Sequence, residues 1–229
     1  MKSIGKISTG VLLVLLLSAC NNAPEEVESN VLQDHTQTIN LHSPESEFTD
    51  WKVALQYLKE GNERYISNST IIRDTNEADR EILKEEQHPF AVIVTCSDSR
   101  VAPEIYFDQK LGDIFVIRNA GNISDESVLG SIEYAVDHLR IPLVVVVGHT
   151  NCGAVGGAFS GGEYPSNLLF IIDVINTATE GCTNLDEAIS ANTKNTIKQI
   201  KNDEVIEELG TVVIGACYDI KSGVVTWIN

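Results

Sequence analysis

Residues 143–153 read LVVVVGHTNCG. Five consecutive apolar residues, four of them valine, are typical of a strand that is buried on both faces of a parallel sheet. The run ends on a glycine and a histidine, and a cysteine follows three residues after the histidine. A buried strand that ends in reactive side chains predicts an α/β fold with a site beyond the end of that strand.

Further short apolar runs repeat this pattern on both sides of the stretch. Residues 90–95 read FAVIVT, residues 114–117 read IFVI, and residues 211–216 and 224–228 give a fourth strand and a final edge strand. Helical patterns alternate with these strands at about residues 50–65, 77–87, 127–139, 165–178 and 184–208. This alternation predicts a mainly parallel central β-sheet flanked by helices, with an amino-terminal helical arm.

Two polar clusters follow the ends of predicted strands. Cys96 begins the sequence CSDSR after residues 90–95, and His149 and Cys152 lie in HTNCG. Each residue alone has a plainer interpretation, as a small core cysteine or a hydrogen-bonded structural histidine. Together, His149 and Cys152 can face one cation while Cys96 approaches from a neighbouring strand. Two thiolates and one imidazole suit zinc, and three protein ligands leave a fourth position open to water. We therefore expect one Zn²⁺ per chain.

The sequence resembles the β-class carbonic anhydrases from about Trp51 to Trp227. Four segments carry the similarity in the order typical of that family: residues 87–100, RNAGN at 118–122, IEYAV at 132–136 and GHTNCGAV at 148–155. The resemblance implies the β-carbonic anhydrase fold, assembled as a homodimer or homotetramer. It also implies an enzyme that reversibly hydrates carbon dioxide to bicarbonate and a proton by means of a zinc-bound hydroxide.

The resemblance also implies roles for individual residues. Its zinc ligands would be Cys96, His149 and Cys152, and its catalytic pair would be Asp98 and Arg100. In a closed state of such sites, Asp98 is a fourth zinc ligand. We expect the open arrangement instead, because Arg100 offers Asp98 two parallel charge-assisted hydrogen bonds, whereas zinc offers one bond and must give up its water.

Other positions are less specific. By position, Gln87, Phe115 and Tyr134 match the substrate-binding pocket of the family. For Phe115 and Tyr134 the alternative is plain core packing, and for Gln87 it is a solvated helix end. Cys182 and Cys217 match no family position, and outside the cytoplasm they could form a disulfide if their Cα atoms lay about 4.4–6.8 Å apart.

Three other functions fit part of the pattern. Related hydrolases with the same fold and site act on carbonyl sulfide or carbon disulfide, and the sequence does not directly exclude those substrates. A non-catalytic zinc-binding or bicarbonate-binding lipoprotein is a second alternative, but zinc binding alone would need neither Asp98 nor Arg100. A redox function is disfavoured because the chain contains no Cys-x-x-Cys motif.

The first 19 residues predict a secretory signal. Lys2 and Lys6 precede an apolar run at residues 11–17, which is too short to cross a bilayer but fits the core of a signal peptide. Residues 17–20 read LSAC and resemble a bacterial lipobox, in which Cys20 becomes the lipidated first residue of the mature chain. The alternative is an ordinary signal peptide with an incidental cysteine. We expect a protein outside the cytoplasm, lipid-anchored to a bacterial membrane.

Composition divides the remaining chain into a tether and a domain. Residues 20–48 are polar and acidic and predict a flexible tether, whereas residues 49–229 can form one domain with a sizeable core. Loss of residues 1–19 removes two lysines and no acidic residue, so the net charge falls from −17 to −19. This charge argues against nucleic acid as a partner and against electrostatic binding to anionic lipids. Membrane attachment would therefore depend on the acyl chains.

Overall fold

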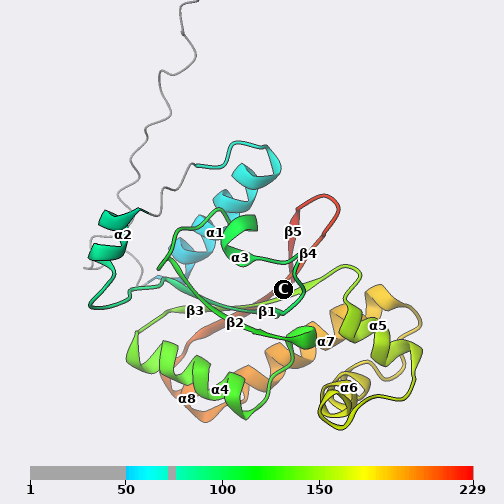
Figure 1. The fold of residues 1–229 in the computed structure, drawn as a ribbon. Coiled ribbons are helices and arrows are strands. Elements are labelled where there is room, and N and C mark those ends of the chain that lie inside the picture. The colour runs from blue at the N-terminus through cyan, green and yellow to red at the C-terminus, as the bar shows by residue number, and fades with distance from the viewer. Residues whose placement is uncertain (1–49, 72–75, 229) are drawn as a thin grey trace, which may run out of the picture. The chain divides into compact units, whose positions relative to one another are not determined.

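A computed structural model describes residues 50–71 and 76–228 of the chain. The predicted signal at residues 1–19, Cys20 and nearly all of the sequence before α1 lie outside the described residues. A five-stranded sheet in the order β2-β1-β3-β4-β5 forms the centre of the domain (Figure 1). The strands are β1 (Ala91–Cys96), β2 (Ile114–Asn119), β3 (Leu143–His149), β4 (Val212–Tyr218) and β5 (Val225–Ile228).

The sheet confirms the predicted α/β class. The first four strands are parallel, and β5 pairs with β4 in the antiparallel direction as an edge strand. Every residue of β1 and β3 is buried, as their continuous apolar sequences predict. Alternate residues of these strands pack into two hydrophobic cores, so that Ile93 and Val145 face one core while Val92 and Val144 face the other.

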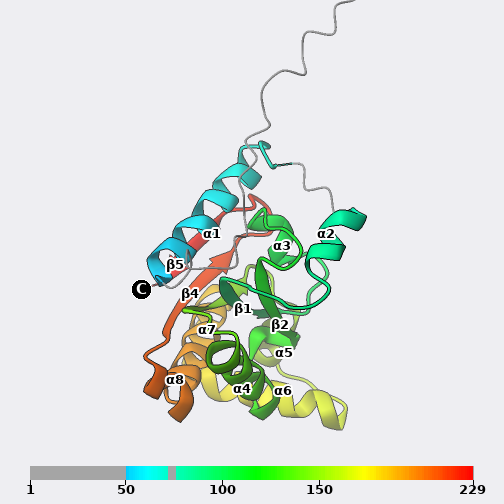
Figure 2. The same cartoon turned by 90° about the vertical axis from the view of Figure 1, so that its left-hand side faces the viewer.

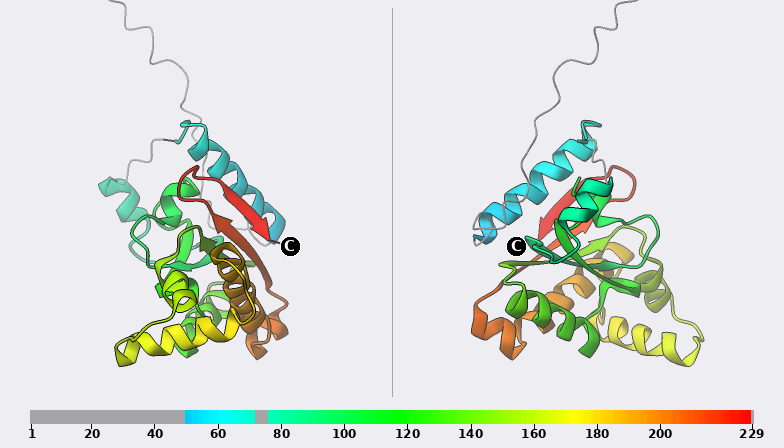
Figure 3. Two further views of the ribbon diagram at one scale, coloured as in Figure 1. Left: turned by 90° about the vertical axis from the view of Figure 1, so that its right-hand side faces the viewer. Right: turned by 60° about the vertical axis from the view of Figure 1, so that its left-hand side comes forward.

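Helices cover both faces of the sheet. The arm helix α1 (Trp51–Ile66) and the short α3 (Pro103–Tyr106) lie on one face, and α4 (Glu126–Glu133) and α7 (Leu185–Lys201) lie on the other (Figure 1). Helix α1 runs alongside β5, as Figures 2 and 3 show from several directions. Its N-cap is Asp50, whose side chain accepts a hydrogen bond from the backbone amide of Lys52.

Several helix boundaries differ from the sequence prediction. Helix α2 (Glu77–Ile82) ends earlier than expected, and the pattern at residues 184–208 divides into α7 and α8 (Glu204–Leu209). The break occurs at Asp203, whose carboxylate caps the first turn of α8. The predicted helix at 127–139 is α4 followed by one π-helical turn, η2 (Tyr134–His138), and the pattern at 165–178 is α6 (Ser166–Ala178).

The sequence did not indicate three further elements. These are α3, the 3₁₀ turn η1 (Ala120–Asn122) and α5 (Gly153–Ser160), which contains three glycines and shows little helical periodicity. Helix α5 begins directly after Cys152 of the predicted site, and η1 begins directly after β2. None of the helices in the described ranges is both long enough and apolar enough to cross a membrane.

Candidate metal centre

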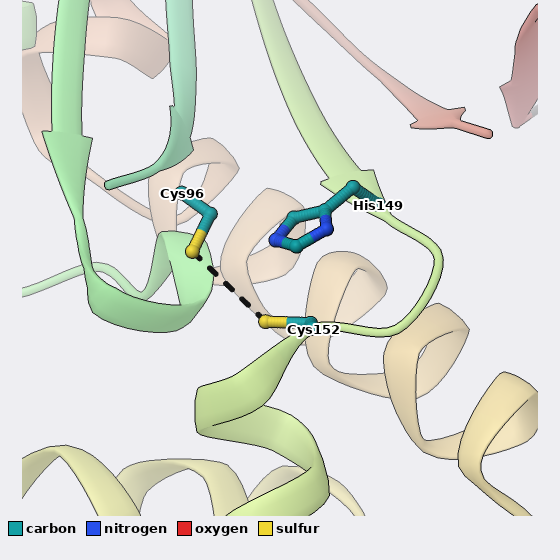
Figure 4. A group of neighbouring side chains, drawn as sticks. All are labelled: Cys96, His149 and Cys152. Atoms are coloured by element: carbon teal, nitrogen blue, oxygen red, sulfur yellow. Dashed lines mark hydrogen bonds between the residues drawn. The ribbon is translucent and has the colours of Figure 1, made fainter. Parts of the chain in front are cut away.

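Cys96, His149 and Cys152 come together at the carboxyl edge of the sheet. Cys96 is the last residue of β1, His149 is the last residue of the adjacent strand β3, and Cys152 immediately precedes α5. Their side chains point toward one another (Figure 4), and their ligand atoms all lie within 4.8 Å of each other. All three residues are buried, with exposed fractions of 4% or less.

The arrangement of these side chains fits a zinc ion. Two sulfurs that each lie about 2.3 Å from one zinc ion at a tetrahedral angle are about 3.8 Å apart. The Sγ atoms of Cys96 and Cys152 are 4.0 Å apart. The Nε2 atom of His149 is buried and has no hydrogen-bond partner among the described residues. A buried nitrogen without a partner beside two sulfurs is the donor set that zinc prefers.

Backbone contacts orient the histidine ring. Its Nδ1 atom lies 3.0 Å from the carbonyl oxygen of Thr150, which can only accept a hydrogen bond. Nδ1 therefore carries the proton, and Nε2 keeps the lone pair that a metal requires. Thr150 is itself held on both sides, because its amide donates to the carbonyl of Tyr218 and its hydroxyl accepts from the amide of Ile220.

The two thiols influence each other's ionisation. A hydrogen bond from Cys152, with smaller contributions from His149 and the backbone amide of Gly121, lowers the pKa of Cys96 against the opposing effect of burial. The hydrogen bond with Cys96, together with burial, raises the pKa of Cys152. A metal binds cysteine as thiolate, and the lowered pKa of Cys96 favours that form.

Asp98 and Arg100 form a bidentate ion pair directly after Cys96. The Nε and Nη2 atoms of Arg100 donate to the two carboxylate oxygens of Asp98 at 2.9 and 2.7 Å. The backbone amide of Arg100 donates to the same carboxylate at 2.9 Å. This hydrogen bonding by Arg100 holds the pKa of Asp98 well below its usual range. The carboxylate is therefore charged, and both of its oxygens face Arg100.

Arg118 holds the backbone that runs from Cys96 to Asp98. Its Nε atom donates to the carbonyl of Cys96 at 3.0 Å, and its Nη2 atom donates to the carbonyl of Asp98 at 2.7 Å. The amide of Ser97 also donates to the carbonyl of Asn119. In the sequence, Arg118 is the first residue of the RNAGN segment, and no pattern there predicts a role for it. Its function depends on a contact between β2 and β1, which the order of residues along the chain does not reveal.

The three predicted pocket residues lie elsewhere in the chain. The rings of Phe115 and Tyr134 are neighbours, with centroids 6.2 Å apart, and Tyr134 is 46% exposed. Phe115 precedes Asn119, the register partner of Cys96, by four residues, which corresponds to about 13 Å along the strand. Gln87 is exposed in the segment before β1. Within one chain, the structure pairs Phe115 with Tyr134 but does not bring Phe115 to the cysteines.

The other two cysteines of the described domain do not join the site. Cys182 and Cys217 are both partly buried and both free thiols. Burial, with smaller effects of Asp186 and Asp219, raises the pKa of Cys217. The described residues therefore offer one cluster in which cysteine, histidine and a metal ion can meet.

The sequence of this chain is similar to those of known proteins. The carbonic anhydrase family model matches residues 91–225. A carbonic anhydrase of Mycolicibacterium smegmatis is 38% identical over 189 residues, which cover 76% of this chain and 89% of that protein. Carbonic anhydrase 2 of Mycobacterium tuberculosis is 52% identical over 110 residues, which span 48% of this chain and 51% of that protein.

Solved structures give the same result for the fold. A crystal structure from a study of two tetrameric β-carbonic anhydrases of Sordaria macrospora has a TM-score of 0.62 and 26% identity, covering 77% of this chain and 97% of that one. A β-carbonic anhydrase of Aspergillus fumigatus has a TM-score of 0.58 and 27% identity, covering 78% of this chain and 90% of that one.

Proposed function

The chain belongs to the β-carbonic anhydrase family, and from this we propose that Cys96, His149 and Cys152 hold its zinc while Asp98 and Arg100 orient the reacting water. It is a zinc-dependent enzyme that reversibly hydrates carbon dioxide to bicarbonate. The observation that carries the assignment is the buried Cys-His-Cys group, with ligand atoms within 4.8 Å of one another, directly beside an intact Asp98–Arg100 pair.

The chemistry divides between the metal and the protein. When bound, zinc supplies a Lewis acid that lowers the pKa of a coordinated water to about 7. Asp98 is a charged acceptor and can take a hydrogen bond from the reacting water, which aims an oxygen lone pair at carbon dioxide. Arg100 keeps both oxygens of Asp98 in fixed positions and holds the carboxylate away from the metal ligands. Orientation of this kind acts on the transition state, where the new bond forms.

The position of Phe115 favours a substrate pocket built from more than one chain. Phe115 lies along β2 at a distance from Cys96, and Tyr134 is exposed beside it. If Phe115 binds substrate next to the cysteines, it would come from a second copy of the chain. The similar β-carbonic anhydrases of Sordaria macrospora are described as tetrameric, which supports assembly of this chain as a homodimer or homotetramer.

Membrane attachment is a second part of the proposal. The LSAC sequence that ends at Cys20 and the short apolar run before it support a lipid-anchored enzyme outside the cytoplasm. The acidic composition of residues 20–48 supports a flexible tether between anchor and enzyme.

One assay tests the enzymatic proposal. The purified domain should hydrate carbon dioxide in stopped-flow measurements at a rate proportional to its zinc content. Carbonyl sulfide serves as the control substrate, because hydrolases on the same fold would act on it. Rapid hydrolysis of carbonyl sulfide with slow hydration of carbon dioxide would overturn the assignment.

A further inference from the structure

The 3₁₀ turn η1 contacts the sulfur of a proposed zinc ligand. The backbone amide of Gly121 donates a hydrogen bond to Sγ of Cys96 at 3.3 Å. A hydrogen bond to a thiolate withdraws electron density from the sulfur, so it adjusts how strongly that sulfur donates to a metal. The position of the Gly121 amide therefore affects how strongly Cys96 binds a metal.

Only glycine suits this position in the turn. Gly121 has a φ of 75°, in the left-handed region. A Cβ atom there would also lie 2.8 Å from Cδ1 of Ile175 and 3.3 Å from Cβ of Ala154. The chain brings its backbone close to Cys96 in a place where a side chain has no room.

Helix α7 binds the backbone carbonyl of Gly121. The side-chain amide of Asn192 donates to the carbonyl of Gly121 at 2.7 Å, across a separation of 71 residues. Asn192 is 1% exposed. One backbone group of Gly121 thus contacts Cys96, while the other is bound by a buried side chain from a distant helix.

Packing alone does not account for Asn192. Its Oδ1 atom is buried and has no hydrogen-bond partner among the described residues. An unpaired buried oxygen costs about as much as, or more than, one hydrogen bond contributes, and an apolar side chain of similar size would avoid that cost. The benefit of an amide at this position therefore lies in the hydrogen bond that it donates to the carbonyl of Gly121.

We propose that Asn192 is a positioning residue that sets the hydrogen bond from Gly121 to the Cys96 sulfur and so tunes the metal centre. This inference rests on the proposed function, since it assigns a supporting residue to the same zinc ligand. It extends the site from the sheet edge into α7.

The same helix supplies a matched control. One turn after Asn192, Thr196 donates to the carbonyl of Asn122 at 3.0 Å, and it is also 1% exposed. Asn192→Leu and Thr196→Val therefore each remove one buried hydrogen bond from α7 to neighbouring carbonyls of η1. Gly121 also contacts the Cys96 sulfur through its backbone amide. Asn122, whose carbonyl Thr196 binds, is not the residue that makes this contact.

The experiment replaces zinc with Co²⁺ and records the thiolate-to-cobalt charge-transfer band, with zinc affinity measured by chelator competition. In Asn192→Leu the band should move to longer wavelength, because a sulfur that loses its hydrogen bond is easier to oxidise. Zinc affinity should fall about 10-fold or more, the usual effect of removing an outer-shell partner that orients a ligand, because this loss outweighs the stronger donation by a sulfur without its hydrogen bond. Thr196→Val should leave the band in place and change affinity less than about threefold.

The outcomes separate this inference from the proposed function. Equal band positions in Asn192→Leu and the wild type, or equal shifts in both variants, would overturn the role of Asn192. A wild-type protein that binds neither metal would instead contradict the zinc site itself. If circular dichroism shows that Asn192→Leu does not fold, Asn192→Ser replaces it, because serine is smaller and its hydroxyl falls short of the Gly121 carbonyl.

Discussion

Replacement of Arg118 by methionine should slow carbon dioxide hydration without emptying the metal site. Arg118 donates to the carbonyls of Cys96 and Asp98, one on each side of Ser97. It thus links the backbone at Cys96, a proposed zinc ligand, to the backbone at Asp98, the proposed acceptor of a hydrogen bond from the reacting water. Methionine keeps the length and much of the apolar stem but has no donor.

The hydrogen bonds set the size of the effect. A hydrogen bond from a charged group contributes about 1.5–3 kcal/mol, and the exposure of Arg118 favours the lower end of that range. Two bonds at about 1.5 kcal/mol amount to about 3 kcal/mol, or about 10²-fold in rate if all of it orients the transition state. The bond from Ser97 to Asn119 remains and retains part of the loop geometry. We therefore expect kcat/KM to fall between about 10-fold and 10²-fold.

The assay is stopped-flow hydration of carbon dioxide, with zinc content and melting temperature measured on the same samples. Arg118→Lys is the control, because an ammonium can reach one carbonyl but lacks the planar fork for two, and its rate should be intermediate. Wild-type kcat/KM in fully loaded Arg118→Met would refute the proposed clamp. A loss of rate that merely follows a loss of zinc would show that Arg118 supports metal binding and not the orientation of Asp98.

The remaining predictions concern the metal ligands, the dyad, pH and the anchor. Cys152→Ser should lose zinc, and full occupancy by metal analysis would show that the site is misassigned. Arg100→Ala and Asp98→Ala should each keep zinc and lose about 10²-fold in hydration rate, so near-normal rates at confirmed occupancy would remove the dyad from the mechanism. In the wild type, hydration should rise with pH through about 7. Asp98 should add no second step there, because its pKa is held below its usual range and the carboxylate is already charged; a second rise in rate with pH that disappears in Asp98→Ala would contradict this. Cys20→Ala should abolish detergent partitioning of the expressed protein, and unchanged partitioning and mobility would exclude the lipid anchor.

Sequence patterns predicted the parts of this protein that depend on local chemistry. The apolar run at residues 143–147 specifies a strand buried on both faces wherever it lies, and the residues that end it must fall at the sheet edge. The proposed ligands His149 and Cys152 could be paired for the same reason, because they are close in sequence. Cys96 could be added because parallel strands end at one edge.

Contacts between distant segments could not be predicted in this way. Asn192 lies in a helix whose sequence shows only a mixed polar face, and its partner Gly121 lies 71 residues earlier. Arg118 resembles an ordinary charged residue at a strand end until β2 pairs with β1. Helix α5 was missed because its three glycines weaken helical propensity, while tertiary packing stabilises it. In each case the deciding interaction is long-range.

The proposed ligands also tie metal uptake to folding of the whole domain. Cys96 and His149 end different strands, and 52 residues separate them in the chain. They meet only after β1 and β3 have paired in parallel, a contact between segments that lie far apart in the chain. An unfolded chain therefore has no preformed cluster, and zinc binds the native state preferentially. Free zinc at 100 times its dissociation constant would add about 2.7 kcal/mol to the free energy of unfolding. The supply of zinc would then govern not only how fast the enzyme works but also how long each molecule survives proteolysis.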